Sequence, residues 1–235
     1  MLTVFTSCHN QAAYLPAAIE SVLRQTHSEF VYHLIDDGST DNTWDTILTY
    51  AEKDDRIEPI RLTKQPNVGP VINMSLRNSE DYWVWCPSDD ELHPDLLEKK
   101  LDFSKEFPNA VIYDDWYTMD SMSKKLVEKH VPIMTPCEFN QEVWKSSPIG
   151  FTGIWLPVAV IKTLNHWFPE HLLFSEDFYW MIEATLLGIQ FIGYPEILHM
   201  KRKHTNTTTS KNISAILAQI PIIRQELAEK YNVNQ

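Results

Sequence analysis

Two adjacent carboxylates, Asp89 and Asp90, follow shortly after the apolar run Tyr82 to Cys86. An apolar run of this length is typical of a core strand, and the loops after the strands of an open α/β sheet face the ligand crevice. A hard cation such as Mg²⁺ or Mn²⁺ needs only one or two carboxylates, because water and substrate phosphate oxygens complete its shell. The pair therefore suits a metal and a diphosphate. Taken alone, it fits equally well a solvated acidic turn or the cap of a helix beginning near Pro94.

A second carboxylate pair, Asp36 and Asp37, comes directly after the strand-like run Phe30 to Ile35. A turn and a helix pattern follow, in which Gly38 supplies the turn and Asp41 suits the helix cap, so these two residues are more simply structural. Asp36 and Asp37 are harder to explain by structure alone. Two strand ends thus carry paired carboxylates.

These pairs belong to a longer ordered set of motifs, and with that set the chain resembles the inverting family 2 glycosyltransferases, which have the nucleotide-sugar-binding GT-A fold. No single motif is diagnostic, but their order and spacing are specific. The set comprises the strand Leu2 to Ser7 leading into Cys8-His9-Asn10, Tyr14-Leu15, the helix end Ser21 to Thr26, Ile35 to Asp41, Asn67-Val68-Gly69, Ser88-Asp89-Asp90, Glu176-Asp177 and Lys201-Arg202-Lys203-His204.

The resemblance implies a site for the nucleotide donor. Asp37 matches the aspartate that accepts a hydrogen bond from uracil, while His9 stands where the family often has an aromatic residue. The implied nucleotide-binding residues are Thr6, His9, Asp36, Asp37 and Asp89, although Thr6 and His9 are equally explained as partners of local backbone groups.

The resemblance also implies a site for a divalent cation, Mn²⁺ or Mg²⁺, and for the diphosphate. Asp90 is the implied metal ligand, with Asp89 at the ribose or in support of the metal. His204 is implied as a metal or phosphate ligand. Contacts to the diphosphate are implied for Lys201, Arg202 and Lys203, for which a solvated basic run is the alternative.

Glu176 and Asp177 begin a helix pattern that ends at Gly188. Acidic residues in a first helical turn are common because they complement the helix dipole. The resemblance makes Asp177 the catalytic base, which takes the proton of the acceptor hydroxyl as that oxygen attacks the anomeric carbon. A single displacement inverts the configuration of that carbon. Glu176 is then a positioning residue.

Composition agrees with a single compact enzyme. The 235 residues are 43% hydrophobic and can bury a sizeable core. The net charge of −12 argues against a nucleic-acid surface, which needs clustered Lys and Arg. An odd number of cysteines without paired metal spacing, and the absence of a secretory or transmembrane-length run, lead us to expect a cytoplasmic protein, with peripheral membrane contact if its acceptor is lipid-linked.

The expected fold is a mostly parallel, Rossmann-like central sheet flanked by helices, with a mixed acceptor-side half. We expect a single GT-A domain over 1–235, divided into a nucleotide-binding half (1–113), an acceptor-binding half (114–210) and a C-terminal helix (211–235) kinked at Pro221. Strands are expected at Arg56 to Leu62 and Ala110 to Tyr113. We expect Lys201 to Ser210 to be a mobile loop until a nucleotide binds.

The function implied by the resemblance is metal-dependent inverting transfer of a sugar, with a UDP-sugar favoured as donor. The acceptor would be a saccharide or lipid-linked saccharide, in bacterial cell-surface polysaccharide or lipopolysaccharide synthesis. One alternative is a sugar-phosphate nucleotidyltransferase, but Thr6 to Leu15 lacks the glycine-rich phosphate loop of such enzymes. Another is a non-catalytic nucleotide-sugar-binding subunit. The six glycines form neither a P-loop nor a dinucleotide fingerprint.

Overall fold

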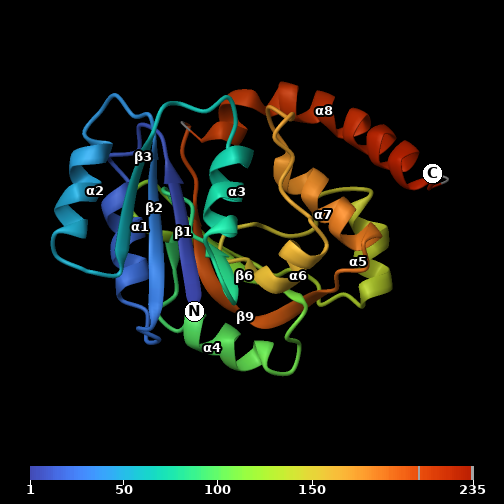
Figure 1. Cartoon of the computed structure of the whole chain (residues 1–235), viewed down its shortest axis with the longest axis horizontal. Coiled ribbons are helices and arrows are strands. Elements are labelled where there is room, and N and C mark those ends of the chain that lie inside the picture. The colour runs from blue at the N-terminus through green and yellow to red at the C-terminus, as the bar shows by residue number, and fades with distance from the viewer. Residues whose placement is uncertain (206, 234–235) are drawn as a thin grey trace.

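A twisted sheet runs through the molecule and carries helices on both faces (Figure 1). The computed structural model describes residues 1–205 and 207–233. The strands are β1 (Leu2–Cys8), β2 (Phe30–Asp37), β3 (Ile57–Leu62), β4 (Tyr82–Trp85), β5 (Glu91–Leu92), β6 (Val111–Met119), β7 (Lys125–Lys129), β8 (Trp155–Pro157) and β9 (Phe191–Arg202). The helices are α1 (Leu15–Leu23), α2 (Thr43–Ala51), α3 (Gly69–Arg77), α4 (Leu96–Ser104), α5 (Pro136–Val143), α6 (Val158–Thr163), α7 (Glu176–Leu186) and α8 (Thr208–Tyr231).

The first part of the sheet is parallel, in the order β3-β2-β1-β4. Strands buried on both faces read as near-continuous apolar runs, as β1 and β2 do. The register pairs Cys8 with Asp36 and Phe5 with Trp85. Because parallel strands end at the same edge of the sheet, the loops after β1, β2 and β4 share that edge.

The second part of the sheet is mixed, as expected for the acceptor-side half. Strand β8 is antiparallel to β4 and β6, and β9 runs parallel to β6. The short β5, which begins directly after Asp90, is antiparallel to β9 and pairs Glu91 with Met200. This register places Lys201 beside Asp90, although the two residues are far apart in sequence.

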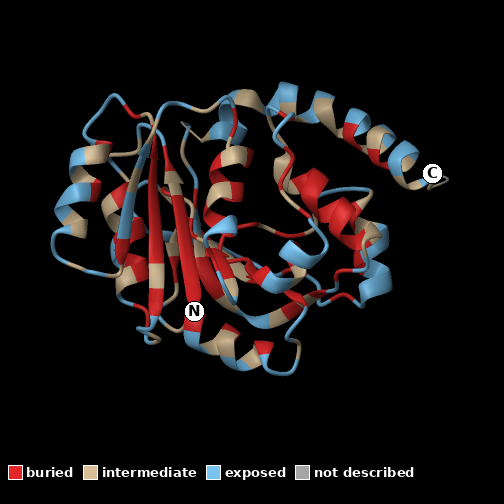
Figure 2. Cartoon of the chain, in the orientation of Figure 1, coloured by how far each residue is buried: buried red, intermediate tan, exposed pale blue. Residues whose placement is uncertain are grey.

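Two hydrophobic clusters, one on each face of the sheet, form the interior (Figure 2). Helices α1, α2 and α4 pack on one face, through residues such as Ile19, Ile47 and Leu97. Helices α3, α5, α6, α7 and α8 contribute to the other, where Trp180 is fully buried. Helix α5 begins with a capping box in which Thr135 and Glu138 exchange hydrogen bonds.

Several sequence-based expectations require correction. Strand β6 continues to Met119 and pairs with β7, where the sequence pattern is weak, because cross-strand contacts rather than apolar periodicity stabilise this hairpin. The mobile loop expected over Lys201 to Ser210 is wrong at both ends, since β9 includes Lys201 and α8 begins at Thr208. Residue 206, within that span, lies outside the described residues.

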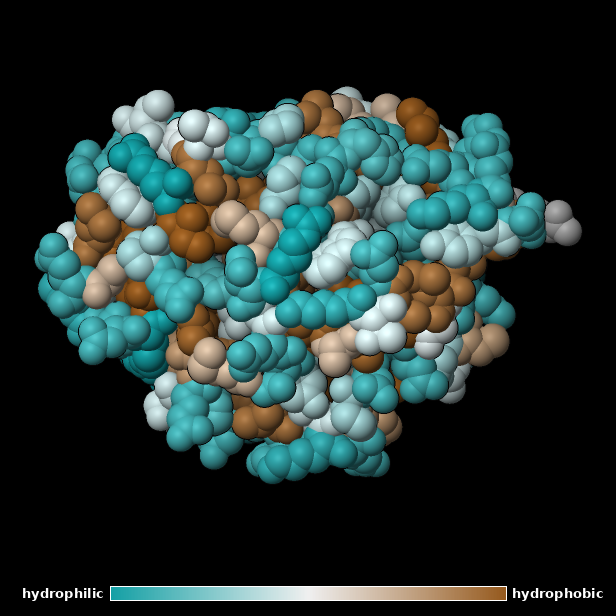
Figure 3. Space-filling view, in the orientation of Figure 1, coloured by the Kyte–Doolittle hydropathy of each residue, from teal (hydrophilic) through white to brown (hydrophobic). Residues whose placement is uncertain are grey.

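The kink expected in α8 at Pro221 lies instead at Asn212, whose φ of −123° and ψ of 18° are non-helical. Pro221 lies inside the helix. None of the helices in the described part of the chain combines the length and apolar character that a membrane crossing needs. The face of the molecule in Figure 3 is mainly hydrophilic, with scattered apolar side chains over α8 at its upper edge. Exposed apolar residues of α8 include Ile213, Leu217 and Ile222.

Candidate active site

The carboxylates at the end of β2 are held by protein partners. Asp37 Oδ2 accepts from the Lys64 ammonium at 2.6 Å and Oδ1 accepts from the backbone N–H of Gln65 at 2.7 Å. Asp36 is fully buried, accepts from the backbone N–H of Ser39 at 3.0 Å and pairs with Arg61 at 3.2 Å. Each carboxylate therefore has a cation beside it, and Asp36 faces the interior of its own loop.

Gly38 allows this loop to lie against the segment that carries Lys64. Its φ is +71°, in the region that favours glycine, and a Cβ there would come within 2.5 Å of the backbone nitrogen of Lys64. A side chain at this position would push that segment away from Asp37. Gly38 therefore has the structural role that the sequence predicts, because no side chain fits at this position.

His9, just after β1, and Thr6, within it, differ in exposure. His9 is exposed beside the end of β2, and its Nδ1–H donates to the carbonyl of Asp37 at 3.0 Å. Thr6 is fully buried, donates to the carbonyl of Cys86 at 2.5 Å and bonds to the Tyr32 hydroxyl at 2.8 Å. The Thr6 hydroxyl thus connects β1 to its neighbours inside the sheet, while His9 faces solvent.

The two aspartates of the acidic loop after β4 differ in burial. Asp90 is buried, with Oδ1 accepting from the backbone N–H of Arg202 at 2.7 Å and Oδ2 accepting from the Thr152 hydroxyl at 2.6 Å. Asp89 is partly exposed, and its Oδ2 lies 3.1 Å from Nε2 of His204. The structure therefore brings His204 to Asp89, whereas the sequence pairs it with Asp90 as a metal ligand. Burial, followed by the charge of Asp89, raises the pKa of Asp90.

Arg202 lies beneath this loop. Its guanidinium contacts Glu91 Oε1 at 2.7 Å and donates to the carbonyls of Asp89 at 2.7 Å and Asp120 at 3.0 Å. The side chain is only 2% exposed. Of the basic run, Lys201 and Lys203 are exposed. Arg202 is thus occupied in fixing the backbone of the acidic loop.

Tyr14 is a residue of this site to which the sequence gives no role. Its ring lies 4.5 Å from the ring of His204, and the guanidinium of Arg202 lies 5.1 Å from its centre. The sequence signal was its place in the ordered motif set. The role of Thr152, whose hydroxyl donates to Asp90, could not be predicted from the sequence, because this residue lies in a segment without apolar periodicity.

The two acidic residues that begin α7, Glu176 and Asp177, are half-buried. Ser175, the residue before the helix, has a left-handed φ of 61°. Asp177 accepts from the backbone N–H of Phe178 at 2.7 Å. Burial raises the pKa of Asp177, and burial together with the charge of Asp177 raises the pKa of Glu176. A carboxylate with a raised pKa is a better proton acceptor at neutral pH than an exposed one.

Lys201 links the acidic loop to the start of α7. Its positive charge lowers the pKa of both Asp90 and Asp177, against the larger effect of burial. Two carboxylate sites from distant parts of the sequence therefore act on one ammonium group.

The residues can also be tested for their fit to a divalent cation. Within residues 1–205 and 207–233, no cluster of three or more His, Cys, Asp or Glu side chains is placed to hold a metal. A Mg²⁺ or Mn²⁺ ion can be held by one or two protein groups when substrate phosphates supply the rest. Asp89 and His204 fit that requirement, since a partly exposed carboxylate and a largely covered imidazole lie together in the loop.

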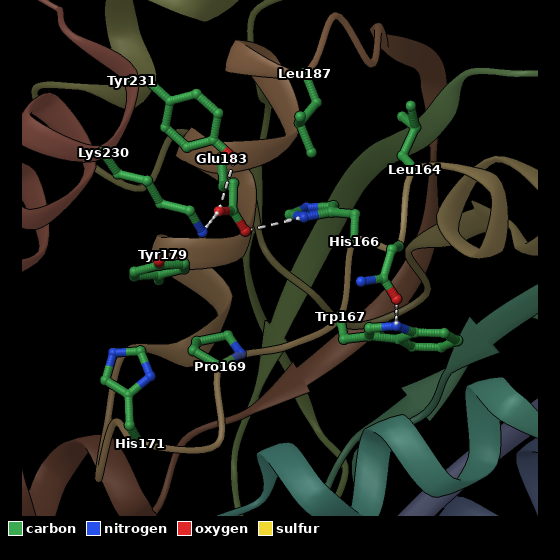
Figure 4. A pocket seen from close by; sticks show the side chains of 11 residues that line it. Leu164, His166, Trp167, Pro169, His171, Tyr179, Glu183, Leu187, Lys230 and Tyr231 are labelled. Carbon is green, nitrogen blue, oxygen red and sulfur yellow. Dashed lines mark hydrogen bonds and ion pairs between the residues drawn. The ribbon is translucent and has the colours of Figure 1, made fainter.

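A separate pocket of about 400 Å³ opens between α7, α8 and the segment 164–171 (Figure 4). Its Glu183 accepts from Lys230 at 2.5 Å and from the Tyr231 hydroxyl at 2.9 Å, and lies 3.1 Å from Nδ1 of His166. None of the predicted site residues lines this pocket. Its carboxylate is neutralised by neighbours, unlike those near Lys201.

Comparison with known proteins decides the family. Residues 3–163, more than half of the chain, match the sequence model described as Glycosyl transferase family 2. This chain belongs to glycosyl transferase family 2. It is 32% identical over 107 residues to the putative teichuronic acid biosynthesis glycosyltransferase TuaG of Bacillus subtilis, a match that covers 45% of this chain and 42% of TuaG. It is 24% identical over 227 residues to an uncharacterized glycosyltransferase of Haemophilus influenzae, covering 89% and 68%.

Solved structures confirm the predicted fold for this family 2 chain. The S. aureus TarS 1-349 complex with UDP-GlcNAc superposes with a TM-score of 0.76 at 19% identity, over 94% of this chain and 66% of that one. The mannosyltransferase PcManGT of Pyrobaculum calidifontis, in complex with GDP-Man and Mn²⁺, superposes with a TM-score of 0.70 at 13% identity, over 97% and 64%. The chain thus spans about two fifths of TuaG and less than two thirds of PcManGT.

Proposed function

We propose that this chain transfers a sugar, with inversion, from a nucleotide diphosphate donor to an acceptor hydroxyl, and that the transfer depends on a divalent metal. The proposal is supported by the charge of Lys201, which acts on the carboxylates of both Asp90 and Asp177. A donor whose diphosphate lies at the acidic loop would then have its anomeric carbon near the carboxylate of Asp177. UDP is the favoured nucleotide, because Asp37 matches the family aspartate that accepts from uracil, which would share this carboxylate with Lys64 and Gln65.

The proposed reaction uses the chain's own groups in three ways. Asp177 removes the proton of the acceptor hydroxyl as its oxygen attacks the anomeric carbon, and Glu176 helps to keep that site buried. Lys201 and Lys203 balance the charge of the departing diphosphate. Asp90, Thr152 and Arg202 hold the acidic loop in place.

Asp89 and His204 are the groups that would hold the cation, with Asp90 supporting them from below. When bound, such a cation supplies positive charge to the diphosphate leaving group. This assignment exchanges the roles first given to Asp89 and Asp90, because Asp89 lies beside His204 while both oxygens of Asp90 accept protein hydrogen bonds. Thr6 and Asp36 are proposed to support the nucleotide site from within.

The acceptor is proposed to be a saccharide or lipid-linked saccharide of a bacterial cell-surface polymer. TuaG is named for teichuronic acid biosynthesis, and the TarS structure contains UDP-GlcNAc, which supports this setting. The proposed location is the cytoplasm, peripheral to the inner face of the membrane when the acceptor is lipid-linked. A nucleotidyltransferase would instead release pyrophosphate from a nucleoside triphosphate.

The test is a panel of UDP-sugars and GDP-mannose, measured for binding by calorimetry and for release of the free nucleotide, with Mn²⁺ and then with a chelator. We expect at least one donor to bind and turn over with Mn²⁺ and to lose about tenfold or more in affinity with the chelator. Asp89→Ala should lose the Mn²⁺-dependent part alone, while Asp102→Ala, an exposed carboxylate paired with Lys105, serves as the matched control. Absence of binding to every donor would refute the proposal, and binding without turnover would favour a non-catalytic subunit.

A further inference from the structure

A charged network is buried beside the proposed site. Lys100 and Asp114, both fully buried, form an ion pair, and the Lys100 ammonium also donates to the carbonyl of Gly153 at 2.7 Å. The other oxygen of Asp114 lies 2.8 Å from Nδ1 of His199, whose side chain is 1% exposed. The network connects α4, β6 and β9.

The network fixes which nitrogen of His199 carries the proton. Lys100 and His199 together lower the pKa of Asp114, against the effect of burial, so Asp114 is a carboxylate that accepts from Nδ1–H. Burial lowers the pKa of His199, so its imidazole is neutral and Nε2 presents a lone pair. Within the described residues, this buried Nε2 has no hydrogen-bond partner. An unpaired buried acceptor is costly, which favours a donor at this position.

Gly150 lies against this lone pair and against the ammonium of Lys201. A Cβ added at Gly150 would lie 3.9 Å from Nε2 of His199 and 3.9 Å from Nζ of Lys201. A group at the position of that Cβ would thus contact one hydrogen-bond acceptor and one donor. A single hydroxyl, which both donates and accepts, complements that pair.

We propose that His199 and Lys201 together bind one hydroxyl of the transferred sugar, with His199 Nε2 accepting its proton and Lys201 donating to its oxygen. The proposal rests on the proposed function. The sugar must lie next to the diphosphate, and the register of β5 with β9 puts Lys201 beside the acidic loop where the diphosphate is proposed to bind. His199 would therefore determine donor specificity, because a donor lacking that hydroxyl would leave Nε2 buried and unpaired.

The test compares each nucleotide with its sugar form. Calorimetry with Mn²⁺ gives the dissociation constants of UDP, GDP and the sugar nucleotides of the panel, and the ratio of the two constants for the best donor measures the contribution of the sugar. His199→Asn keeps a donor toward Asp114 and removes Nε2. Gly150→Ala fills the space with only ordinary contacts, and the φ of Gly150 is outside the left-handed region, so this variant should fold.

We expect both variants to lower the sugar contribution roughly tenfold while the affinity for the free nucleotide stays within about twofold. His166→Asn is the matched control, because His166 is equally buried and also lies beside a carboxylate, at the separate pocket. An unchanged ratio in Gly150→Ala and His199→Asn would overturn the proposal and assign the space to an ordered water. Equal losses for nucleotide and sugar nucleotide would overturn it too, as a structural effect. If the wild type binds nothing, the proposed function fails instead.

Discussion

The pKa values of the buried or half-buried carboxylates are shifted in opposite directions at the two ends of helix α7. At its beginning, burial raises the pKa of Glu176 and Asp177, and the charge of Lys201 on β9 offsets this only in part for Asp177. Further along, burial also acts on Glu183, but hydrogen bonds from His166 and Lys230 outweigh it and lower the pKa to about 2. The same helix therefore carries a neutralised carboxylate for stability and two poorly neutralised ones.

This difference indicates where the chain keeps reactive groups at a cost in stability. Carboxylates whose charged form is disfavoured by their surroundings destabilise a fold, so the pair at the start of α7 is more easily explained by catalysis than by structure. The acids at the end of β2 resemble Glu183, because Asp36 and Asp37 have Arg61 and Lys64 beside them. The contrast separates supporting carboxylates from the proposed base.

The largest expected effect comes from replacing the proposed base. Asp177→Asn preserves shape and removes the proton acceptor, so transfer should fall by roughly 10²-fold or more while donor binding persists. Glu183→Gln, on the same helix, is the control and should keep its turnover at temperatures where it is folded. Rates of nucleotide release measure both. Wild-type turnover in Asp177→Asn would contradict the role of Asp177 as the catalytic base.

A smaller effect is expected on stability. Glu176 binds a proton in the folded state above its ordinary pKa of 4.5, so its contribution to stability is present below 4.5 and lost as pH rises through the raised pKa. Glu176→Gln should therefore raise the melting temperature at pH 7 and change it little below pH 4.5.

The contribution of Glu183 to stability changes with pH in the opposite direction. Its lowered pKa contributes stability above 4.5 that is lost as pH falls toward about 2. Glu183→Gln should cost about 1–3 kcal/mol at pH 7 through loss of its hydrogen bonds, and less in acid. Thermal unfolding of the two variants across pH tests the pair. Shifts of the same sign at pH 7 would contradict the contrast between the two ends of α7.

The smallest expected effect is on the pH profile of transfer. Lys201 lowers the pKa of Asp177, so Lys201→Met should move the acidic limb of activity to higher pH, by about one unit or less. Lys230→Met, which removes a partner of Glu183, should leave that limb in place. The pH dependence of the rate with saturating donor measures the shift. An acidic limb of the pH–rate profile that does not move in Lys201→Met would show that Lys201 does not affect the pKa of the proposed base.

The parallel half of the fold was predictable from sequence because its strands are buried apolar runs with acidic turns after them. Strand β7 was not predictable, because all five of its residues are exposed and only pairing with β6 defines it. For the site, motifs at strand and helix ends name candidate carboxylates such as Asp37 and Asp177, whose roles stay predictions. The role of Arg202 beneath the loop depends on the register of β5 with β9, which a single sequence does not contain.

The central claim is a single displacement assisted by Asp177, and the configuration of the product tests it most directly. NMR of the glycoside formed from an α-linked nucleotide sugar and an acceptor alcohol should show the β-configuration at the new bond, because the acceptor attacks opposite the leaving group. A product that retains the α-configuration would contradict the assignment of Asp177 as the base and, with it, the proposed mechanism.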